Sequence, residues 1–408
     1  RELRKQHDLN HTKKAAAILH QLQEANPSFI NQTVESLLTQ GMGPGSHHKY
    51  SSLGCDFIAS IWNSSSTTYL KLPKLSDGIG NFVVQLVKAA SFAYTKGWNF
   101  AGVEGVLVTS FGGISEVDML DFYFGDHSKL LVDESLINST KRVNINGPIR
   151  SQSHIVNMKL LPNTTIHLHA DRFELERYIA KHNNGSDEAI MHDFNIHMSP
   201  DFLGHLRRGA ACGIQKALST VKREAIDIEP PSTIRVVAHI RMGDVALNSK
   251  FNYKVIPQEL YPVIFEAIRS VCPQCKFYAF TSVLHAHQRR ASQYFFHTLE
   301  KLNVTVFVDT EYGINATDEA LNTIAHFSTA DVLITAKSEF SVVSAYMNPN
   351  CVIYTQYQAN FPLNDWIYLP YVAPNNVTHP HNIKVMIDHI VRGLPGCLAN
   401  KLPHKMKT

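Results

Sequence analysis

Residues 239–244 read His-Ile-Arg-Met-Gly-Asp and combine side chains that can bind an anionic group. Arginine is permanently charged, and its fork of N–H donors fits a phosphate. A glycine in the same stretch allows a sharp turn and lets a ligand approach the backbone. A simpler interpretation also fits, in which Arg241 and Asp244 form a surface ion pair before a turn.

The position of this hexapeptide favours a ligand site. It follows the apolar, β-branched run Ile234–Ala238, which begins after Pro230-Pro231 and predicts a buried strand. Open α/β folds bind their ligands beyond the carboxyl ends of such strands. We therefore expect His239, Arg241, Gly243 and Asp244 to lie at that end of a sheet.

A second segment of similar design spans residues 336–341, Ala-Lys-Ser-Glu-Phe-Ser, between an apolar run and a helical run. Ser338 and Ser341 are residue types that cap helices, and Glu339 suits a first helical turn. The segment therefore predicts a helix start, which can also bind an anion.

A third segment, residues 77–81, reads Asp-Gly-Ile-Gly-Asn and precedes a helical pattern over Phe82–Lys96. Glycines before a helix expose backbone N–H groups at its positive end, which suits a phosphate. A plain helix entry, with no ligand, remains the alternative for Gly78, Gly80 and Asn81.

The elements that must position these segments alternate in the second half of the chain, and this alternation predicts an α/β fold with a parallel sheet covered on both faces. Strands are expected at Ile234–Ile240, Phe277–Thr281, Val304–Val308, Val332–Thr335 and Cys351–Tyr354. Helices are expected at Gln258–Val271, Ala286–Lys301, Thr317–Ser328, Phe340–Met347 and Asn382–Arg392. In the first half, Gly41–Ser76 is expected to be loop, Gly105–Thr109 and Ile166–His169 strands, and Phe202–Arg223 a long helix.

Size and composition describe a globular protein of two domains. A chain of 408 residues exceeds the size at which one core usually stops growing, and we expect a leading helix or stalk over 1–40 and domains over 41–229 and 230–408. A net charge of +3 gives no reason to expect a nucleic-acid partner. No apolar run reaches the roughly 20 residues of a membrane span, although an anchor upstream of Arg1 is compatible with the sequence.

Cysteines and glycosylation sequons favour the secretory pathway of a eukaryote. The six cysteines are an even number, which fits an oxidising compartment. Cys272 and Cys275 form a CxxC lying before a strand, which favours a structural bridge or buried thiols over redox chemistry or zinc. The Asn-X-Ser/Thr sequons are at Asn10, Asn31, Asn63, Asn138, Asn163, Asn184, Asn303, Asn315 and Asn376.

Taken in order, the three segments resemble those of the GT-B fold fucosyltransferases, the superfamily that includes α1,2-, α1,6- and protein O-fucosyltransferases. That family carries a GxGN loop, a strand ending in H-(V/I)-R-x-G-D and a late S-x-F-S segment before a helix. The resemblance covers roughly residues 77–355. The matching residues are Gly78, Gly80, Asn81, His239, Arg241, Gly243, Asp244, Ser338, Phe340 and Ser341.

The resemblance implies an inverting, metal-independent glycosyltransferase of the Golgi or endoplasmic reticulum lumen, with two Rossmann-like domains facing each other across a cleft. Its donor would be GDP-fucose, and its acceptor a glycan or protein hydroxyl. The alternatives are another nucleotide-sugar donor on the same fold, or a non-catalytic glycan-binding relative.

The resemblance also implies roles for single residues. Arg241 would bind the diphosphate, since a fixed cation stabilises charge on a leaving group. Residues 338–341 would hold the phosphates from the other side, and Asn81 would face the donor or acceptor. Asp244 is the candidate general base, with orientation of Arg241 as its alternative role.

The sequence departs from the family pattern at two places. Thr281, which matches a Thr-Asp pair near the nucleotide, is followed here by Ser282. Glu339 stands where the family often has a small or polar residue. An acid beside a diphosphate is unfavourable unless it points away, or it holds a ribose or an acceptor hydroxyl.

Overall fold

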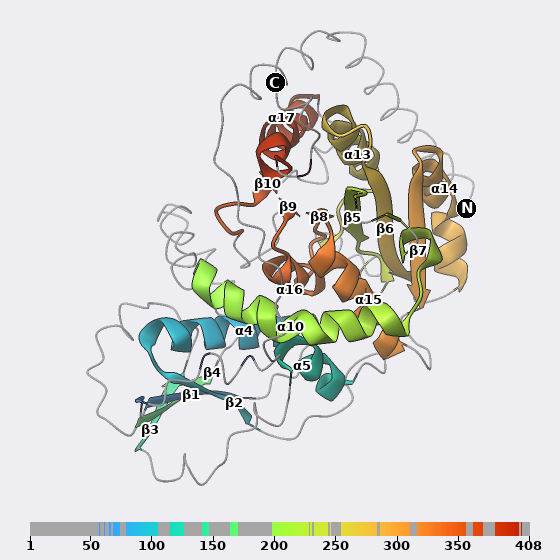
Figure 1. Ribbon diagram of the computed structural model, residues 1–408. Coiled ribbons are helices and arrows are strands. Elements are labelled where there is room, and N and C mark those ends of the chain that lie inside the picture. The colour runs from blue at the N-terminus through green and yellow to red at the C-terminus, as the bar shows by residue number, and fades with distance from the viewer. Residues whose placement is uncertain are drawn as a thin grey trace.

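The computed structural model contains two parallel β-sheets and the helices that cover them (Figure 1). It describes residues 57, 61, 65–66, 68–73, 79–104, 115–125, 141–146, 164–169, 198–227, 229–230, 232–243, 245, 254–283, 286–310, 316–355, 362–369, 380–399 and 401.

The first sheet has four parallel strands in the order β2-β1-β4-β3. Its strands are β1 (Thr68–Pro73), β2 (Asn99–Glu104), β3 (Lys141–Asn146) and β4 (Thr164–His169). The sequence-based expectation of a loop over Gly41–Ser76 is therefore wrong at its end, because β1 lies next to the centre of this sheet. Strand β1 was not expected because its composition is as polar as that of the loop before it. The expected strand Ile166–His169 lies within β4. The expected strand Gly105–Thr109 lies outside the described residues.

The second sheet has six parallel strands in the order β10-β9-β8-β5-β6-β7, which confirms the predicted α/β fold with a parallel sheet. Numbered along the chain, this is the doubly wound order 3-2-1-4-5-6, and its strand order reverses between β5 and β8. The strands are β5 (Arg235–Ile240), β6 (Lys276–Val283), β7 (Val304–Thr310), β8 (Val332–Ile334), β9 (Cys351–Thr355) and β10 (Ile367–Leu369).

Helices cover both faces of the second sheet, as βαβ crossovers require. On one face lie α13 (Leu260–Val271), α14 (Ala286–Lys301) and α17 (Pro380–Cys397); on the other lie α15 (Ala316–Thr329) and α16 (Glu339–Met347). The expected helices of this half agree with these within a few residues at most ends. None of the helices that the structure describes is long and apolar enough to span a membrane.

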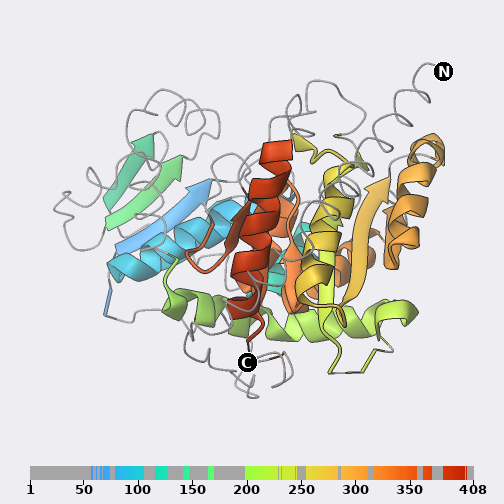
Figure 2. The ribbon, with the colours of Figure 1, turned by 90° about the horizontal axis from the view of Figure 1, so that it is seen from above.

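Two long helices connect the sheets. Helix α4 (Ile79–Lys96) packs on β1 and β2 and also against α16, and α10 (Pro200–Thr220) packs on α15, α16 and α5 (Glu116–Phe124). Figure 1 shows α10 running between the two sheets, and in Figure 2, seen from above, it extends along one side of the molecule. Ser199 caps α10 by accepting a hydrogen bond from Phe202 N at 3.2 Å.

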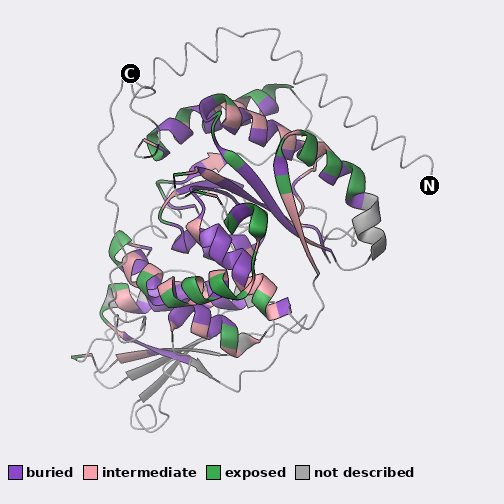
Figure 3. Ribbon diagram, turned by 45° about the vertical axis from the view of Figure 1, so that its right-hand side comes forward, coloured by how far each residue is buried: buried purple, intermediate pink, exposed green. Residues whose placement is uncertain are grey.

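The two halves share one hydrophobic core. Buried residues of α4 and α10, such as Val83 and Phe202, belong to the same cluster as Val237, Phe327 and Tyr346 of the second half. Figure 3 shows α16 buried almost throughout. Helix α4 is buried on several sides because it lies between the first sheet and α16, so its apolar residues exceed one amphipathic face. The relative position of the halves is thus set by packing.

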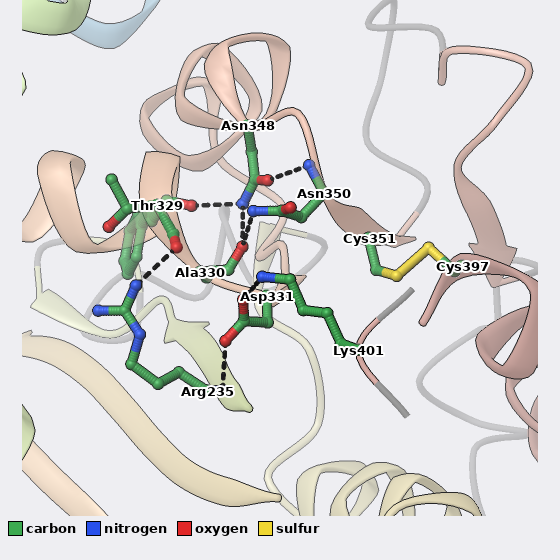
Figure 4. A network of polar contacts seen from close by, with 10 residues as sticks. Arg235, Thr329, Ala330, Asp331, Asn348, Asn350, Cys351, Cys397 and Lys401 are labelled. Carbon is green, nitrogen blue, oxygen red and sulfur yellow. Dashed lines mark hydrogen bonds and ion pairs between the residues drawn. A yellow bond between two sulfur atoms is a disulfide. The ribbon is translucent and has the colours of Figure 1, made fainter. Parts of the chain in front are cut away.

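A dense polar network lies at the amino ends of the strands of the second sheet (Figure 4). Asp331 accepts a hydrogen bond from Arg235 N at 2.6 Å and pairs with Lys401 after α17. Nearby, Cys351 and Cys397 form a disulfide that ties α17 to β9. The network fixes the amino ends of β5, β8 and β9 and the residue after the last helix. These ends lie opposite the carboxyl ends of the strands.

The CxxC pair, Cys272 and Cys275, also forms a disulfide, with a Cα–Cα distance of 5.4 Å. It closes the turn between α13 and β6. Of the two interpretations drawn from the sequence, the structural bridge is therefore confirmed. Cys212 of α10 is disulfide-bonded as well.

Candidate functional site

The predicted segments after β5 and β8 meet at the point where the strand order of the second sheet reverses. Ala238 of β5 pairs with Ile334 of β8 in register, so Arg241 and Lys337 each stand three residues beyond this pair. Arg241 Nη1 donates a hydrogen bond to Ser338 Oγ at 2.7 Å. The guanidinium thereby connects the end of β5 to the N-terminus of α16.

The turn from β8 into α16 is held by its own serines. Ser341 Oγ accepts a hydrogen bond from Ala336 N at 3.1 Å and lies 3.1 Å from Ser338 O. Ser338 occupies the N-cap position in extended conformation, but among the described residues its side chain makes no capping bond. Its hydroxyl faces Arg241 instead, so the first-turn amides of α16 are not capped by this serine.

Gly80 brings the third predicted segment to the same place. A Cβ atom on Gly80 would lie 2.8 Å from Phe340 N and 3.2 Å from the carbonyl carbon of Glu339. The glycine is therefore explained by the close approach of α4 to the first turn of α16. The structure gives Gly80 this packing role, which the sequence motif did not reveal.

His239 lies just below the site on the face covered by α15 and α16. Its ring contacts those of Phe327 and Phe340 at centroid distances of 5.3 and 5.8 Å. Burial, together with the nearby charge of Arg241, lowers the pKa of His239 to about 3, so the imidazole is neutral at physiological pH. Within the described part of the chain, Nδ1 of this buried ring has no hydrogen-bond partner.

Gly243 adopts a left-handed conformation, with φ 49°, that L-residues with side chains rarely adopt. The sharp turn predicted from this glycine is therefore confirmed. Asp244, the candidate base, and Gly78 lie outside the described residues, as does the side chain of Asn81.

Thr281 does not join this group. It pairs in register with Ile240, whereas His239 pairs with Phe280, so the side chains of Thr281 and His239 point to opposite faces of the sheet. The Thr281 side chain is 3% exposed, and its hydroxyl has no hydrogen-bond partner among the described residues.

Two lysines at the site were not among the predicted residues. Lys337, in the turn before α16, is 6% exposed, and burial lowers its pKa to about 8. Burial also lowers the pKa of Lys88 of α4 to about 8, and the negative charge of Glu339 opposes this shift. Lys337 could have been found from its place after a predicted strand. Lys88 offered only the weaker signal of one charge within an apolar helix.

The described site is cationic and made of side chains, helix ends and turns. Arg241 and the N-terminus of α16, which meet at Ser338, can together bind an anion, since they present positive charge and N–H donors. In the ranges that the structure describes, no group of three or more His, Cys, Asp or Glu side chains is placed to hold a metal ion.

No protein-family model matches the chain, and no curated protein sequence does. A solved structure of a FUT1 mutant from Arabidopsis thaliana in complex with GDP is similar at a TM-score of 0.34 and 13% identity, covering 82% of this chain and 81% of that chain. The structure of a glycosyltransferase from Rickettsia africae ESF-5 is similar at a TM-score of 0.29 and 10% identity. The match covers 84% of this chain and 96% of that chain. These TM-scores are too low to carry a functional argument, and the function proposed below therefore rests on the residues of the site.

Proposed function

We propose that the protein is an inverting glycosyltransferase of the GT-B type that transfers fucose from GDP-fucose to a hydroxyl of a glycan or protein. The observation that carries the proposal is the hydrogen bond from Arg241 to Ser338, made where the strand order reverses and at the N-terminus of α16. This is the position at which doubly wound sheets bind nucleotides. A forked cation and the positive end of a helix suit a diphosphate there.

The reaction requires these groups to act on the leaving group. The acceptor oxygen forms a bond to the anomeric carbon while the bond from that carbon to the β-phosphate oxygen breaks. The electron pair stays on the diphosphate, where Arg241 stabilises the growing negative charge. The acceptor proton goes to a base, for which Asp244 is the candidate by its place in the motif.

The choice of fucose and guanine rests on the motif resemblance of the three segments. The proposed lumenal location in the Golgi or endoplasmic reticulum is supported by the sequons and by the disulfides Cys272–Cys275 and Cys351–Cys397. The sequon residue Asn303 is exposed in the turn between α14 and β7, where a glycan can be accommodated.

A donor screen with a hydrolysis readout tests the proposal. The first assay measures hydrolysis of GDP-fucose, other GDP-sugars, UDP-sugars and CMP-sugars. The second measures the shift in unfolding temperature caused by GDP, UDP and CMP, since a ligand at roughly 100 times its Kd stabilises a protein by ~2.7 kcal/mol. Turnover of GDP-fucose supports the proposal. If only another donor is turned over, the choice of fucose is wrong. If no nucleotide binds, the proposal that the protein is a glycosyltransferase is wrong.

Arg241→Ala tests the residue that carries the proposal. Removal of one preorganised donor to a developing charge typically lowers kcat by about 10²–10³-fold. Arg241→Lys keeps the charge without the fork and is expected to fall between wild type and alanine. Arg392→Ala, at an exposed position of α17, is the matched control. Undiminished turnover by Arg241→Ala refutes the role of Arg241.

A further inference from the structure

Each of the two sheets ends in two strands whose outer sides pair with no further strand in the part of the chain that the structure describes. These edge strands are β2 and β3 in the first sheet and β7 and β10 in the second. An edge strand presents a row of N–H and C=O groups with which a strand of another molecule can pair. Proteins therefore protect their edges by short length, charged side chains, proline, bulges or a covering group.

Three of the four edge strands carry such a protection in their own sequence. Strand β10 has only three residues, Ile367–Leu369. Strand β3 begins with Lys141 and Arg142, whose charges disfavour addition of another strand. Strand β2 contains Gly102 with φ 82°, and its pairing with β1 shifts in register, as at a β-bulge. These features limit pairing with another molecule at all three edges.

Strand β7 carries none of these protections in its own sequence. It is seven residues long and pairs with β6 in continuous register from Val304 to Thr310. Its first five residues read Val-Thr-Val-Phe-Val, without proline, glycine or charge. Its one charged residue, Asp309, forms an ion pair with Arg223 at 2.6 Å. Segments of high β-propensity and low charge add to other strands most readily, so the edge of β7 needs a covering group.

A glycosylation sequon, Asn303-Val304-Thr305, lies at the amino end of this strand. Asn303 and Thr305 are both exposed, whereas Val304 between them is buried. The backbone N–H of Asn303 donates a hydrogen bond to Glu300 O at 2.8 Å, and its φ of 54° is one that asparagine adopts more readily than most residues. The backbone of the turn is thereby fixed, with the sequon at the surface beside the edge of β7.

We propose that Asn303 carries an N-linked glycan and that this glycan covers the edge of β7 against pairing with other strands. The proposal rests on the lumenal location in the proposed function. The amide nitrogen of Asn303 forms a bond to the anomeric carbon of a lipid-diphosphate-linked oligosaccharide, while the bond from that carbon to the diphosphate oxygen breaks. The electron pair leaves with the lipid diphosphate, and the amide proton goes to a base of the cell's oligosaccharide transferase. The attached glycan is bulky and solubilising.

The test is secretion of the full chain from eukaryotic cells, followed by glycopeptide mass spectrometry and light scattering. Thr305→Ala removes the sequon and Thr305→Ser keeps it, and the two variants differ only by the hydroxyl group. Thr305→Lys removes the sequon but places a charge on the edge. Thr305→Ser should match wild type in glycan and particle size. Thr305→Ala should lose the glycan and shift to larger particles at the same concentration, and Thr305→Lys should lose the glycan with a smaller shift.

The outcomes separate this inference from the proposed function. If other sequons carry glycans and Asn303 does not, modification of Asn303 is refuted while the lumenal location stands. If no sequon carries a glycan, the lumenal location fails and this inference with it, whereas the donor screen still decides the transferase activity. If Asn303 carries a glycan but Thr305→Ala and Thr305→Ser scatter light equally, the protective role is refuted. Should Thr305→Ala fail to fold, Asn303→Gln provides the same comparison.

Discussion

Gly80→Ala tests whether the junction of α4 and α16 shapes the anion site. The added Cβ would lie 2.8 Å from Phe340 N, and the nearest neighbours are backbone atoms that cannot rotate away. Overpacking of this kind typically costs about 1–3 kcal/mol. Within a helix, alanine returns up to about 1 kcal/mol relative to glycine. With the full gain of about 1 kcal/mol subtracted, we expect a net destabilisation of about 0–2 kcal/mol.

Gly204→Ala is the matched control, because Gly204 also lies in a helix but its added Cβ would meet only Arg208 Nη1, at 3.5 Å. This variant should gain about 0.4–1 kcal/mol. Urea unfolding midpoints of both variants measure the difference, and calorimetry measures GDP affinity. Relief of the clash displaces the first turn of α16, which adjoins the hydrogen bond from Arg241 to Ser338, so only Gly80→Ala should also bind GDP more weakly. The reasoning is refuted if Gly80→Ala is as stable as Gly204→Ala.

Three further expectations concern the pKa of Lys337, the contact of α10 with the end of α16, and the amino ends of the strands of the second sheet. Burial lowers the pKa of Lys337 from 10.5 to about 8, so the unfolded chain binds more protons than the folded chain between these pH values and the unfolding free energy should rise with pH there; an equal pH dependence of the unfolding free energy for wild type and Lys337→Met would contradict this. Arg207→Met removes donors to the carbonyls of Tyr346 and Asn348 at 3.3 and 3.1 Å, and should lower the unfolding free energy by about 1–2 kcal/mol; unchanged unfolding would count against it. Asp331→Asn should cost about 1–3 kcal/mol in the same assay without changing GDP affinity, and an affinity change would show that the amino edge is coupled to the site.

The second half of the chain was largely predictable because its strands are buried on both faces. The apolar, β-branched run at Val236–Ala238 and the similar runs at β6, β8 and β9 are interrupted by helical patterns of sufficient length. The first sheet was harder to predict. Strand β1 reads Thr-Tyr-Leu-Lys-Leu-Pro, which resembles the polar loop before it, and β3 alternates polar residues. Short strands of mixed polarity are fixed by tertiary pairing, which one sequence does not display.

The site was predictable in its parts and less so in its contacts. The order of the three segments placed Arg241, Ser338 and Gly80 together, and the structure brings them together. The sequence did not reveal that Gly80 serves helix packing, nor that Ser341 fixes the turn from within. The packing role of Gly80 depends on distances below 4 Å between segments far apart in the chain, and local patterns carry no information on such distances.

The amino and carboxyl ends of the strands of the second sheet differ in how their polar groups are hydrogen-bonded. At the amino edge, Asp331 receives the Arg235 backbone N–H and pairs with Lys401, while the amides of Asn348 and Asn350 donate to Ala330 O (Figure 4). At the carboxyl ends of the strands, by contrast, Nδ1 of the buried His239 ring has no hydrogen-bond partner among the described residues.

Unsatisfied or poorly solvated groups cost free energy, and a fold tolerates them where a ligand or ordered water completes them. The hydrogen-bond network at the amino ends holds the strands in register. Polar groups at the carboxyl ends are thereby kept in position for such a ligand. An apolar residue in place of Lys401, at the amino ends of the strands, removes the partner of Asp331 and should therefore lower stability while leaving donor affinity unchanged.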